Sequence, residues 1–398
     1  MLKNLIKIFL LYLKKLIPKK KILVFGDRAG RRFADNSRYL FIYLSEFRKD
    51  YKCVWITSDI KIKDYLIKKN YICCTPFSLK GIYYILSAKY NLYNFVEDDI
   101  NRFFTELSDS IHLWHGVLPK KLKEIKTKET KLNNFFYKKV KKYFLYPNKE
   151  MSLNIFNRFP KNKYQLKIYN LPRNIIFDKK LKNSNIFRTD GEIIFREKIL
   201  KSKKKIFGYF PTWRPDGLEL FRDVKDLTKL DEINIILKKT NSLMIIKKHM
   251  NSDKKDKNIL YNNKIEELIN HLQSLESFVF ADYDFDLNSI LDVCDILITD
   301  YSGVIFDFLY LDRPIITYAP DYEKFKSNTG FILDPTKNDF TFYVNNFDQL
   351  KNLIFNFETN NNNFKNTHIK NRSIIKDRVF LKNSGIKEIV EFIDSKAS

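Results

Sequence analysis

Cysteine is scarce in this sequence, with only four residues among 398. None of them has the spacing of a zinc site, and Cys53 and Cys294 stand in apolar runs that resemble buried strands. We therefore interpret the cysteines as reduced thiols in the core of a cytoplasmic protein. A long uninterrupted apolar run is also missing. A spanning helix needs about 20 apolar residues without internal charges, and a secretory signal needs a small-residue cleavage site, which is absent.

Acidic residues are outnumbered, with 47 Asp and Glu against 72 Lys and Arg, so the net charge is +25 and the pI is near 9.5. Such a charge attracts a polyanion, which can be nucleic acid, anionic lipid or a phosphate-rich substrate. The sequence has no Lys/Arg-rich arm, zinc-finger spacing or RNA-binding aromatic motif. We therefore expect no nucleic-acid partner, and favour a membrane surface or a phosphate-containing substrate.

The first 17 residues are apolar except for a few lysines and Asn4. At 100° per residue, Lys3, Lys7 and Lys14 fall on one narrow side of a helix, and apolar residues occupy the remainder. We expect residues 1–20 to form an amphipathic basic helix that lies in the interface of an anionic membrane. The alternative is a helix packed on the protein's own surface.

From Lys21 onward, apolar strand-like runs alternate with helical stretches, which predicts parallel α/β sheets. The polar stretch 178–205 separates two such sets. We predict two doubly wound Rossmann-like domains that face each other across a cleft. The expected boundaries are 21–195 for an N-terminal acceptor-side domain, 196–380 for a C-terminal donor-binding domain, and 381–398 for a closing helix. Strands are expected at 22–25, 53–57, 90–96, 111–114, 143–146, 166–170, 206–210, 243–246, 278–280, 296–298 and 315–318.

The stretch 295–314 carries a polar turn between a buried strand and an apolar helix. Thr299, Asp300 and Ser302 form the turn, and Ser302 is a good N-cap for a helix predicted over 304–311. Free backbone N–H groups and the positive end of a helix dipole can bind phosphate at such a place. The alternative is an ordinary strand–helix connection with a serine cap.

Other polar groups follow strands in the same way. His115 ends the strand at 111–114 and can act as a general base, although a structural histidine is the alternative. After the strand at 206–210, Thr212 offers a hydroxyl and Arg214 a planar set of phosphate donors. His249 follows the strand at 243–246 and can donate to phosphate, whereas Arg173 can face an anion or lie in a solvated turn. Ligands of doubly wound sheets bind at the strands' carboxyl ends, so together these groups predict a phosphate-handling cleft.

Several segments resemble those of the CDP-glycerol glycerophosphotransferase family, which includes teichoic-acid and capsule polymerases and primases. The resemblance covers about 110–335 and is most specific between 298 and 320. Two positions depart from the family pattern: Gly303 replaces a common second serine, and Ile175 replaces an acid. The segments are Trp114-His115-Gly116, Pro211-Thr212-Trp213-Arg214, Lys248-His249, Thr299-Asp300-Tyr301-Ser302, Phe306-Asp307-Phe308, Arg313-Pro314 and Gly330-Phe331.

The resemblance implies a GT-B type fold and a peripheral enzyme at the cytoplasmic face of the membrane. An acceptor hydroxyl would attack the β-phosphate of a CDP-activated polyol, and CMP would leave. His115 would be the base, His249 would bind the donor diphosphate, and Thr299, Ser302 and the following helix N-terminus would hold phosphate. No tightly bound cofactor is expected beyond the CDP-polyol donor. No tightly bound metal is expected either, because Asp282, Asp284 and Asp286 fit a solvated loop.

The resemblance implies an acceptor that is a membrane-linked or capsular glycan or another phosphate-rich polymer. The polyol can be glycerol, ribitol or another, and both primase and polymerase remain open. Two rival functions also remain at this point. One is a nucleotide-sugar glycosyltransferase of the same architecture, and the other is a non-catalytic membrane module that binds polyanions.

Overall fold

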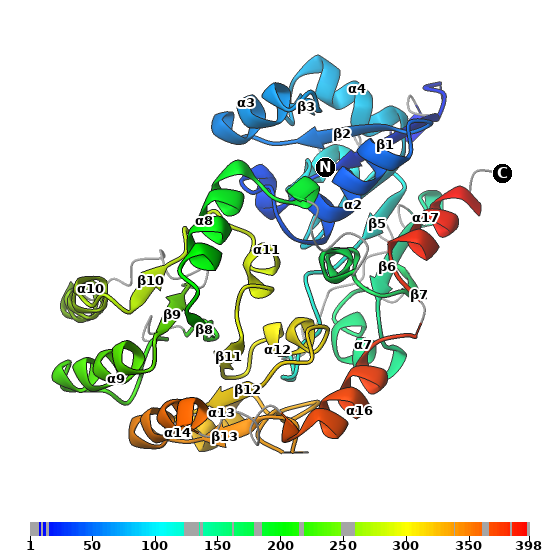
Figure 1. Ribbon diagram of the computed structural model, residues 1–398. Coiled ribbons are helices and arrows are strands. Elements are labelled where there is room, and N and C mark those ends of the chain that lie inside the picture. The colour runs from blue at the N-terminus through cyan, green and yellow to red at the C-terminus, as the bar shows by residue number, and fades with distance from the viewer. Residues whose placement is uncertain are drawn as a thin grey trace. The chain divides into compact units, whose positions relative to one another are not determined.

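The chain folds into two compact units (Figure 1). Unit 1 comprises residues 1–116, 124–187 and 380–398, and unit 2 comprises residues 117–123 and 188–379. The junction expected from the sequence lies at 195/196, whereas the chain passes into unit 2 at Arg188. The computed structural model describes residues 8, 11–12, 16–122, 135, 138–160, 163–178, 185–214, 219–247, 259–337, 339–359, 366–382 and 384–395.

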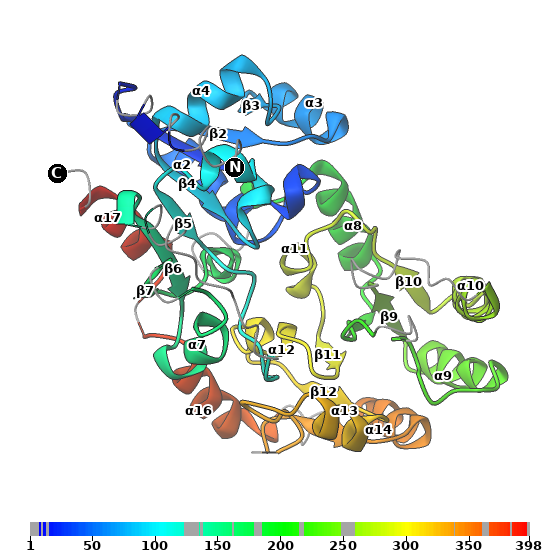
Figure 2. The same ribbon diagram turned by 180° about the vertical axis from the view of Figure 1, so that it is seen from behind.

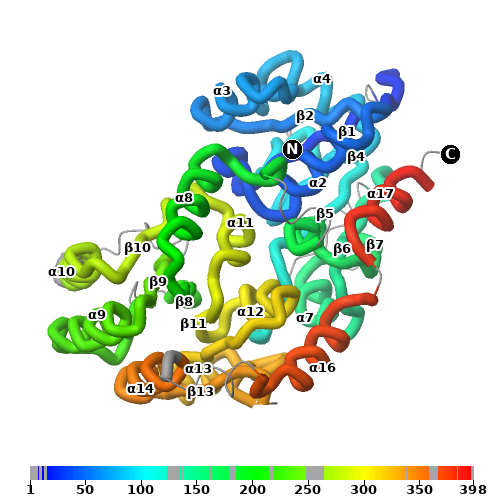
Figure 3. The backbone as a smooth tube through the Cα atoms, viewed as in Figure 1, coloured from blue at the N-terminus to red at the C-terminus, as the bar shows by residue number. Residues whose placement is uncertain are grey.

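The last residues of the chain belong to unit 1 rather than forming a separate element. Figure 3 traces the chain from α16 (Ile369–Val379) to α17 (Ile386–Ser395). Asn170 fixes this segment, because its Nδ2 donates to the carbonyls of Leu381 and Ser384 at 2.8 and 2.7 Å. Its Oδ1 accepts from the Leu381 N–H. The apolar face of α17 is buried in the core of unit 1, through Ile389 and Ile393 among others.

The sheet of unit 1 has seven strands in the order β3-β2-β1-β4-β5-β6-β7, all paired in parallel (Figure 2). The strands are β1 Lys20–Phe25, β2 Lys52–Ile56, β3 Ile72–Cys74, β4 Ala88–Tyr93, β5 Ser110–His112, β6 Lys142–Tyr146 and β7 Gln165–Ile168. The helices are α2 Asp35–Phe47, α3 Ile60–Lys68, α4 Leu79–Ser87, α5 Arg102–Thr105, α7 Lys149–Phe156 and α17, with short 3₁₀ turns at Arg28–Gly30, Glu97–Asp99, Pro172–Phe177 and Asn185–Phe187.

Both faces of this sheet are covered, as parallel sheets require. Leu23 and Phe25 of β1 pack on one face against residues of α2 and α17. Ile22 and Val24 point to the other face and pack with Ile85 of α4. The alternation follows from the two-residue period of a strand, so the near-continuous apolar runs seen in the sequence serve two separate cores.

The sheet of unit 2 has six parallel strands in the order β10-β9-β8-β11-β12-β13. The strands are β8 Lys205–Tyr209, β9 Ser242–Ile246, β10 Phe278–Phe280, β11 Ile296–Thr299, β12 Ile315–Tyr318 and β13 Phe342–Val344. The helices are α8 Asp190–Lys201, α9 Thr228–Lys239, α10 Ile259–Ser274, α11 Asn288–Leu291, α12 Val304–Phe308, α13 Tyr322–Asn328, α14 Phe347–Thr359 and α16.

One face of this second sheet packs on α9, α10 and α14, which bring Leu230, Leu272 and Ile354 to a common core. Alternate strand residues such as Ile245 and Leu297 point to the opposite face and are fully buried there. Both units are therefore doubly wound, and the predicted α/β fold class is confirmed. Among the described helices, none has the length and apolarity needed to cross a membrane.

Each sheet has one place where the strand order reverses direction, and ligands of doubly wound sheets bind there, outside the carboxyl ends. In unit 1 the reversal lies between β1 and β4, and in unit 2 it lies between β8 and β11. The loops that leave these four strands are therefore the parts of the fold best placed to hold a substrate.

Candidate active site

The turn that carries His115 leaves β5 in unit 1, next to the reversal point. Trp114 has a φ of +59° and Gly116 a φ of +131°, so the backbone turns sharply on both sides of His115. Glycine is needed at 116 because side chains rarely adopt that φ, and because a Cβ there would lie 2.5 Å from Nη2 of Arg173. The buried Asn36, on α2, holds the turn by donating from Nδ2 to the Trp114 carbonyl at 2.8 Å.

Arg173, predicted on the acceptor side, is buried against the same turn. Its Nη1 donates to the carbonyl of His115 and to Oδ1 of Asp35, each at 2.9 Å. Its backbone N–H donates to Oδ1 of Asn36 at 3.1 Å. The sequence suggested an arginine facing a ligand or solvent, but these contacts also join α2, the His115 turn and the segment after β7 into one hydrogen-bonded assembly.

The imidazole of His115 is half-buried between aromatic rings. It stacks on Phe95 with ring centroids 4.3 Å apart, and it lies 4.2 Å from the ring of Trp114. Its Nδ1 is buried and makes no hydrogen bond within the described part of the chain. Burial, and then the positive charges of Arg28 and Arg173, lower the pKa of His115 well below its usual value. The Asn94 backbone acts in the opposite direction but contributes less. The ring is therefore neutral at physiological pH.

Four of the residues predicted at the donor site of unit 2 form one connected cluster at the reversal point. Oδ1 of Asp300 accepts from the Thr212 N–H at 2.8 Å, and its Oδ2 accepts from Nη2 of Arg214 at 2.8 Å. The Thr299 hydroxyl donates to the carbonyl of Phe210 at 2.6 Å. The loops after β8 and β11 are thereby tied together, as their position in the sheet predicts.

The guanidinium of Arg214 is engaged within the protein. Besides Asp300, it donates from Nε to Oδ2 of Asp321 at 2.9 Å and from Nη1 to the Thr212 carbonyl at 2.9 Å. Burial disfavours its charge, but the two carboxylates outweigh burial and raise the pKa of Arg214. By contrast, the Thr212 hydroxyl is buried and has no hydrogen-bond partner among the described residues. Of these two side chains, the threonine hydroxyl is the one that still has hydrogen-bonding capacity for a ligand.

The helix after Ser302 is shorter than predicted, since α12 spans only Val304–Phe308 instead of 304–311. Beyond Phe308 the chain makes i→i+3 hydrogen bonds, such as that from the Leu311 N–H to the Phe308 carbonyl, and Asp312 adopts a positive φ. The apolar spacing that predicted a longer helix is also compatible with these tighter turns. Gly303 is the residue before the helix, and the Ser302 hydroxyl accepts from the Val304 N–H at 3.4 Å.

The segment 117–122, which follows the His115 turn in the chain, belongs to unit 2. The Pro119 carbonyl accepts from the Ile332 N–H at 2.8 Å, and Lys120 pairs with Phe331 in an antiparallel bridge. A Cβ at Gly303 would lie 2.3 Å from the Val117 carbonyl. Glycine at 303, where the family commonly has serine, therefore allows this segment to approach the predicted phosphate-binding turn.

His249 lies outside the described residues, as do its neighbours Lys248 and Met250. Lys247, the last described residue before it, is buried and donates to the carbonyls of Asp282 and Tyr283. Asp282 and Asp284 are exposed, but Asp286 is buried and accepts from the Asn288 N–H. Within the described residues, no three His, Cys, Asp or Glu side chains converge on a position for a metal ion.

Comparison with known proteins decides the family. The model of the CDP-glycerol:poly(glycerophosphate) glycerophosphotransferase family matches residues 8–386. The chain belongs to this family. It is thus an enzyme, a glycerophosphotransferase that uses CDP-glycerol, and the match extends well before residue 110, where the sequence analysis saw only a general plan.

Two curated relatives support this membership. A teichoic acid poly(glycerol phosphate) polymerase of Bacillus spizizenii is 29% identical over 342 residues, which cover 80% of this chain and 79% of that protein. A teichoic acid glycerol-phosphate transferase of Staphylococcus aureus is 27% identical over 345 residues, covering 81% of this chain and 80% of that protein. A solved structure of the wall teichoic acid polymerase TagF has a TM-score of 0.70 at 18% identity, covering 99% of this chain and 96% of that one. The transferase therefore has the GT-B type fold.

Several residues of the His115 surroundings were missed from the sequence. Asp35 and Asn36 come after a turn rather than directly after a strand, so the search for polar groups at strand ends passed over them. Arg28 and Phe95 do follow strands β1 and β4. Arg28 is a polar group after a strand and could have been identified in the same way, whereas Phe95 is apolar and lies within the strand expected at 90–96. Only the strand order reveals that both lie next to His115.

Proposed function

We propose that His115 is the general base of this transferase. In the proposed step, a hydroxyl of the acceptor attacks the β-phosphorus of CDP-glycerol while His115 takes the hydroxyl proton. A new bond forms between the acceptor oxygen and the β-phosphorus. The bond from that phosphorus to the bridging oxygen breaks, and CMP leaves with its electron pair. Phosphoryl transfer of this kind depends on positioning and charge stabilisation more than on covalent help.

The observation that carries this proposal is a neutral imidazole held at the end of β5 with an unpartnered Nδ1. A base must be unprotonated at the working pH, and the lowered pKa of His115 meets that condition. It must also be fixed in place, and Asn36 and Arg173 fasten the turn that carries it. His112, one strand residue before the turn, is fully buried and its Nε2 contacts the Asn94 carbonyl at 2.9 Å, whereas His115 is half-buried at the end of the strand.

For the donor, we propose a site at the reversal point of unit 2. Arg214 and Asp300 would serve this site by holding the loops after β8 and β11 together. The unpartnered Thr212 hydroxyl, the Ser302 turn with Gly303, and Thr299 at the end of β11 would line the diphosphate. His249, which follows β9 in the sequence, would donate to it. The diphosphate charge would favour the protonated form of His249 despite the lysines beside it.

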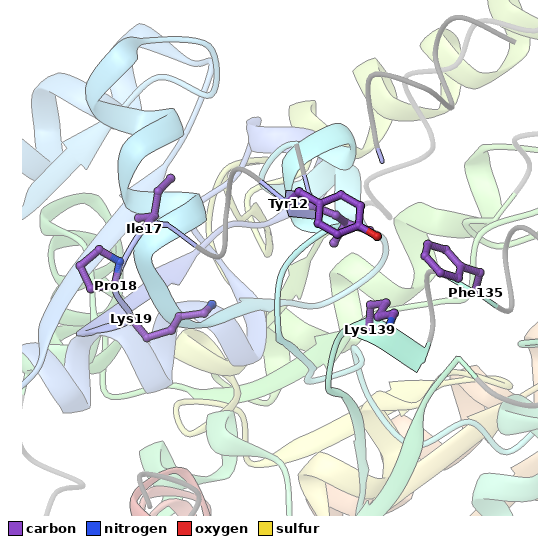
Figure 4. Close-up of a pocket in the computed structure, with 7 residues that line it drawn as sticks. Tyr12, Ile17, Pro18, Lys19, Phe135 and Lys139 are labelled. Atoms are coloured by element: carbon purple, nitrogen blue, oxygen red, sulfur yellow. The ribbon is translucent and has the colours of Figure 1, made fainter. Parts of the chain in front are cut away.

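We further propose that the transferase attaches peripherally to an anionic membrane surface, where a lipid-linked acceptor is available. A pocket of about 330 Å³ lies near the start of the chain, and Figure 4 shows the residues that line it. Tyr12, which lines this pocket, is 59% exposed, and Leu16, one residue before its lining residue Ile17, is 80% exposed. Apolar groups beside lysines suit a membrane interface. The pocket is lined by Leu11, Tyr12, Ile17, Pro18, Lys19, Phe135 and Lys139.

The test of the base is the His115→Ala variant, assayed by CMP release from CDP-glycerol with a saturating acceptor. We expect turnover to fall by roughly 10²-fold or more, the usual contribution of a general base. Binding of CDP-glycerol, measured by calorimetry, should stay within about twofold of wild type, because the base is not assigned a donor contact. His271→Ala, on α10, is the matched control. Near-wild-type turnover in the His115 variant would remove His115 from the mechanism.

A further inference from the structure

The reversal point of unit 1 carries an arginine and an aromatic ring to which no role has been assigned. Arg28 follows β1, and Phe95 follows β4, the two strands between which the order of the sheet reverses. Both residues therefore lie where a doubly wound sheet binds its ligand. His115, after the adjacent strand β5, lies at the same edge.

Arg28, Phe95 and His115 form a stack. The guanidinium carbon of Arg28 lies 3.8 Å from the centroid of the Phe95 ring, and the His115 ring lies 4.3 Å from it. Two groups at that distance cannot share one face of a ring, so Phe95 is sandwiched between them. The cation and the proposed base are separated by a single aromatic ring.

The guanidinium of Arg28 has no hydrogen-bond acceptor among the described residues, and its Nε is buried without a partner. This distinguishes it from Arg214, whose donors are occupied by Asp300, Asp321 and a carbonyl. A half-buried guanidinium that makes only a stacking contact still has N–H groups available to bind a ligand. Two N–H groups in one plane match the geometry of a phosphate or a carboxylate.

The backbone around Arg28 is fixed in an unusual conformation. Arg28, Ala29 and Gly30 all have positive φ, at +46°, +55° and +71°. Asp99 holds this turn, since its Oδ1 accepts from the Ala29 N–H at 3.1 Å, while its Oδ2 accepts from the Phe95 N–H at 2.7 Å. Non-glycine residues in the left-handed region are costly and cluster at functional sites. The same carboxylate thus fixes both Arg28 and Phe95 relative to the backbone.

Two acids lie beneath the turn, and neither forms an ion pair with Arg28 within the described residues. Asp27 is buried, and its Oδ1 accepts from Nδ2 of Asn94 at 2.9 Å. Burial, together with the charge of Asp99, raises the pKa of Asp27 well above its usual value. Burial also raises the pKa of Asp99 to about 6. Burial thus disfavours the charge of Asp27, and the Asp99 carboxylate is engaged by the N–H groups of Ala29, Asn94 and Phe95 rather than by the Arg28 guanidinium.

We propose that Arg28 binds a phosphate group of the acceptor, next to the hydroxyl that His115 deprotonates. This inference rests on the proposed function and makes it more specific, because it assigns to Arg28 the recognition of a phosphate on the acceptor. In a glycerol phosphate terminus, three carbons join the reacting hydroxyl to the phosphate ester, which suits a base and a cation on opposite faces of one ring. A neutral sugar hydroxyl would leave Arg28 unpaired.

The experiment compares two synthetic acceptors that differ only in the terminal phosphate, using the full-length enzyme and CDP-glycerol. For Arg28→Gln we expect kcat/KM to fall roughly 10- to 100-fold with the phosphorylated acceptor, the size of a lost charge-assisted hydrogen bond. With the neutral acceptor we expect a smaller loss, because the variant then alters only the charge that lowers the pKa of His115. The KM of CDP-glycerol should stay within about twofold of wild type. Arg28→Lys keeps a cation and should retain part of the preference for the phosphorylated acceptor over the neutral one. Arg102→Gln removes an exposed arginine of the same unit and is the matched control.

An equal loss with both acceptors would overturn the proposal, as would a raised KM for CDP-glycerol or an unchanged preference. Binding of glycerol 3-phosphate to His115→Ala and to His115→Ala/Arg28→Gln gives a second readout that does not need turnover. Weaker binding in the double variant supports the proposal, and equal binding contradicts it even if Arg28→Gln alone folds poorly. Retained turnover in His115→Ala would refute the base assignment while leaving the binding result for Arg28 intact, so the two failures can be told apart.

Discussion

Replacement of Arg173 by Met tests whether the His115 turn is held by the contacts seen in unit 1. Methionine preserves most of the apolar stem of arginine and removes its donors. The carbonyl of His115 would lose a hydrogen bond of 2.9 Å, and the carboxylate of Asp35 would lose its ion pair at the same distance. We expect the turn to open more often, and turnover to fall with it.

The magnitude follows from burial. The side chains of Arg173 and Asp35 are 8% and 15% exposed, and removing one partner of a buried pair costs about 3–5 kcal/mol. In the variant, Asp35 would still accept a hydrogen bond of 2.8 Å from the Asn36 N–H and would have some access to water. The lower end of this range of free energies therefore applies. A loss of about 3 kcal/mol corresponds to a roughly 10²-fold larger population of the open turn.

Hydrogen exchange under native conditions measures this opening locally, which matters because a chain with two units need not unfold in one step. Amides in peptides spanning 111–117 should exchange about 10²-fold faster in Arg173→Met, and those of unit 2 strands should not change. Arg102→Met is the control, because its ion pair with Asp98 is 2.7 Å long but 55% exposed on the arginine side, and such pairs contribute at most about 1 kcal/mol.

The reasoning fails if exchange in this peptide is unchanged while the KM for the acceptor rises. That result would mean that Arg173 binds substrate, the role first expected from the sequence, and that the turn is held by other contacts. A fall in turnover accompanied by faster exchange would instead place Arg173 among the positioning residues.

Two further predictions concern unit 1. Asp27→Asn keeps the acceptor for Asn94 and should stabilise the protein by about 1–3 kcal/mol at pH 7.5. The pKa of Asp27 is raised in the folded state, so the free energy of unfolding of the wild type falls as the pH rises above about 4. The urea midpoints of the wild type and Asp27→Asn should therefore converge near that pH. A difference in midpoint that stays constant with pH would contradict burial as the cause. Deletion of residues 1–17, which ends before β1, should abolish sedimentation with anionic vesicles, and persistent sedimentation would show that the expected interfacial helix is not the attachment.

The fold could be predicted from the sequence because its strands are short apolar runs between polar residues. Nearly all the expected strands lie within two or three residues of the observed ones, and those at 278–280 and 315–318 coincide with β10 and β12. The two strands that were missed, β3 and β13, have three residues each. Their length alone does not explain the misses, because the predicted strands β5 and β10 also have three residues each.

The candidate site could be predicted only in part, because its residues meet through strand order. His115, Thr212, Arg214 and Asp300 are polar groups that follow strands in the sequence, and the last three are joined by hydrogen bonds. The assignment of segment 117–123 to unit 2 had no sequence signal. It depends on backbone contacts such as that of Pro119 with Ile332, to which any residue type can contribute.

The comparison of Arg28 with Arg214 shows why position after a strand is a weak guide to what an arginine binds. Both follow a central strand at a reversal point, and of the two only Arg214 was predicted from the sequence to bind phosphate. In the folded chain Arg214 is surrounded by Asp300, Asp321 and the Thr212 carbonyl, so a phosphate would have to compete with acceptors already in place. Arg28 has one face covered by Phe95 and no acceptor at its edge among the described residues. A buried donor without a partner is costly, so it is Arg28, rather than Arg214, whose environment is completed by an anionic substrate.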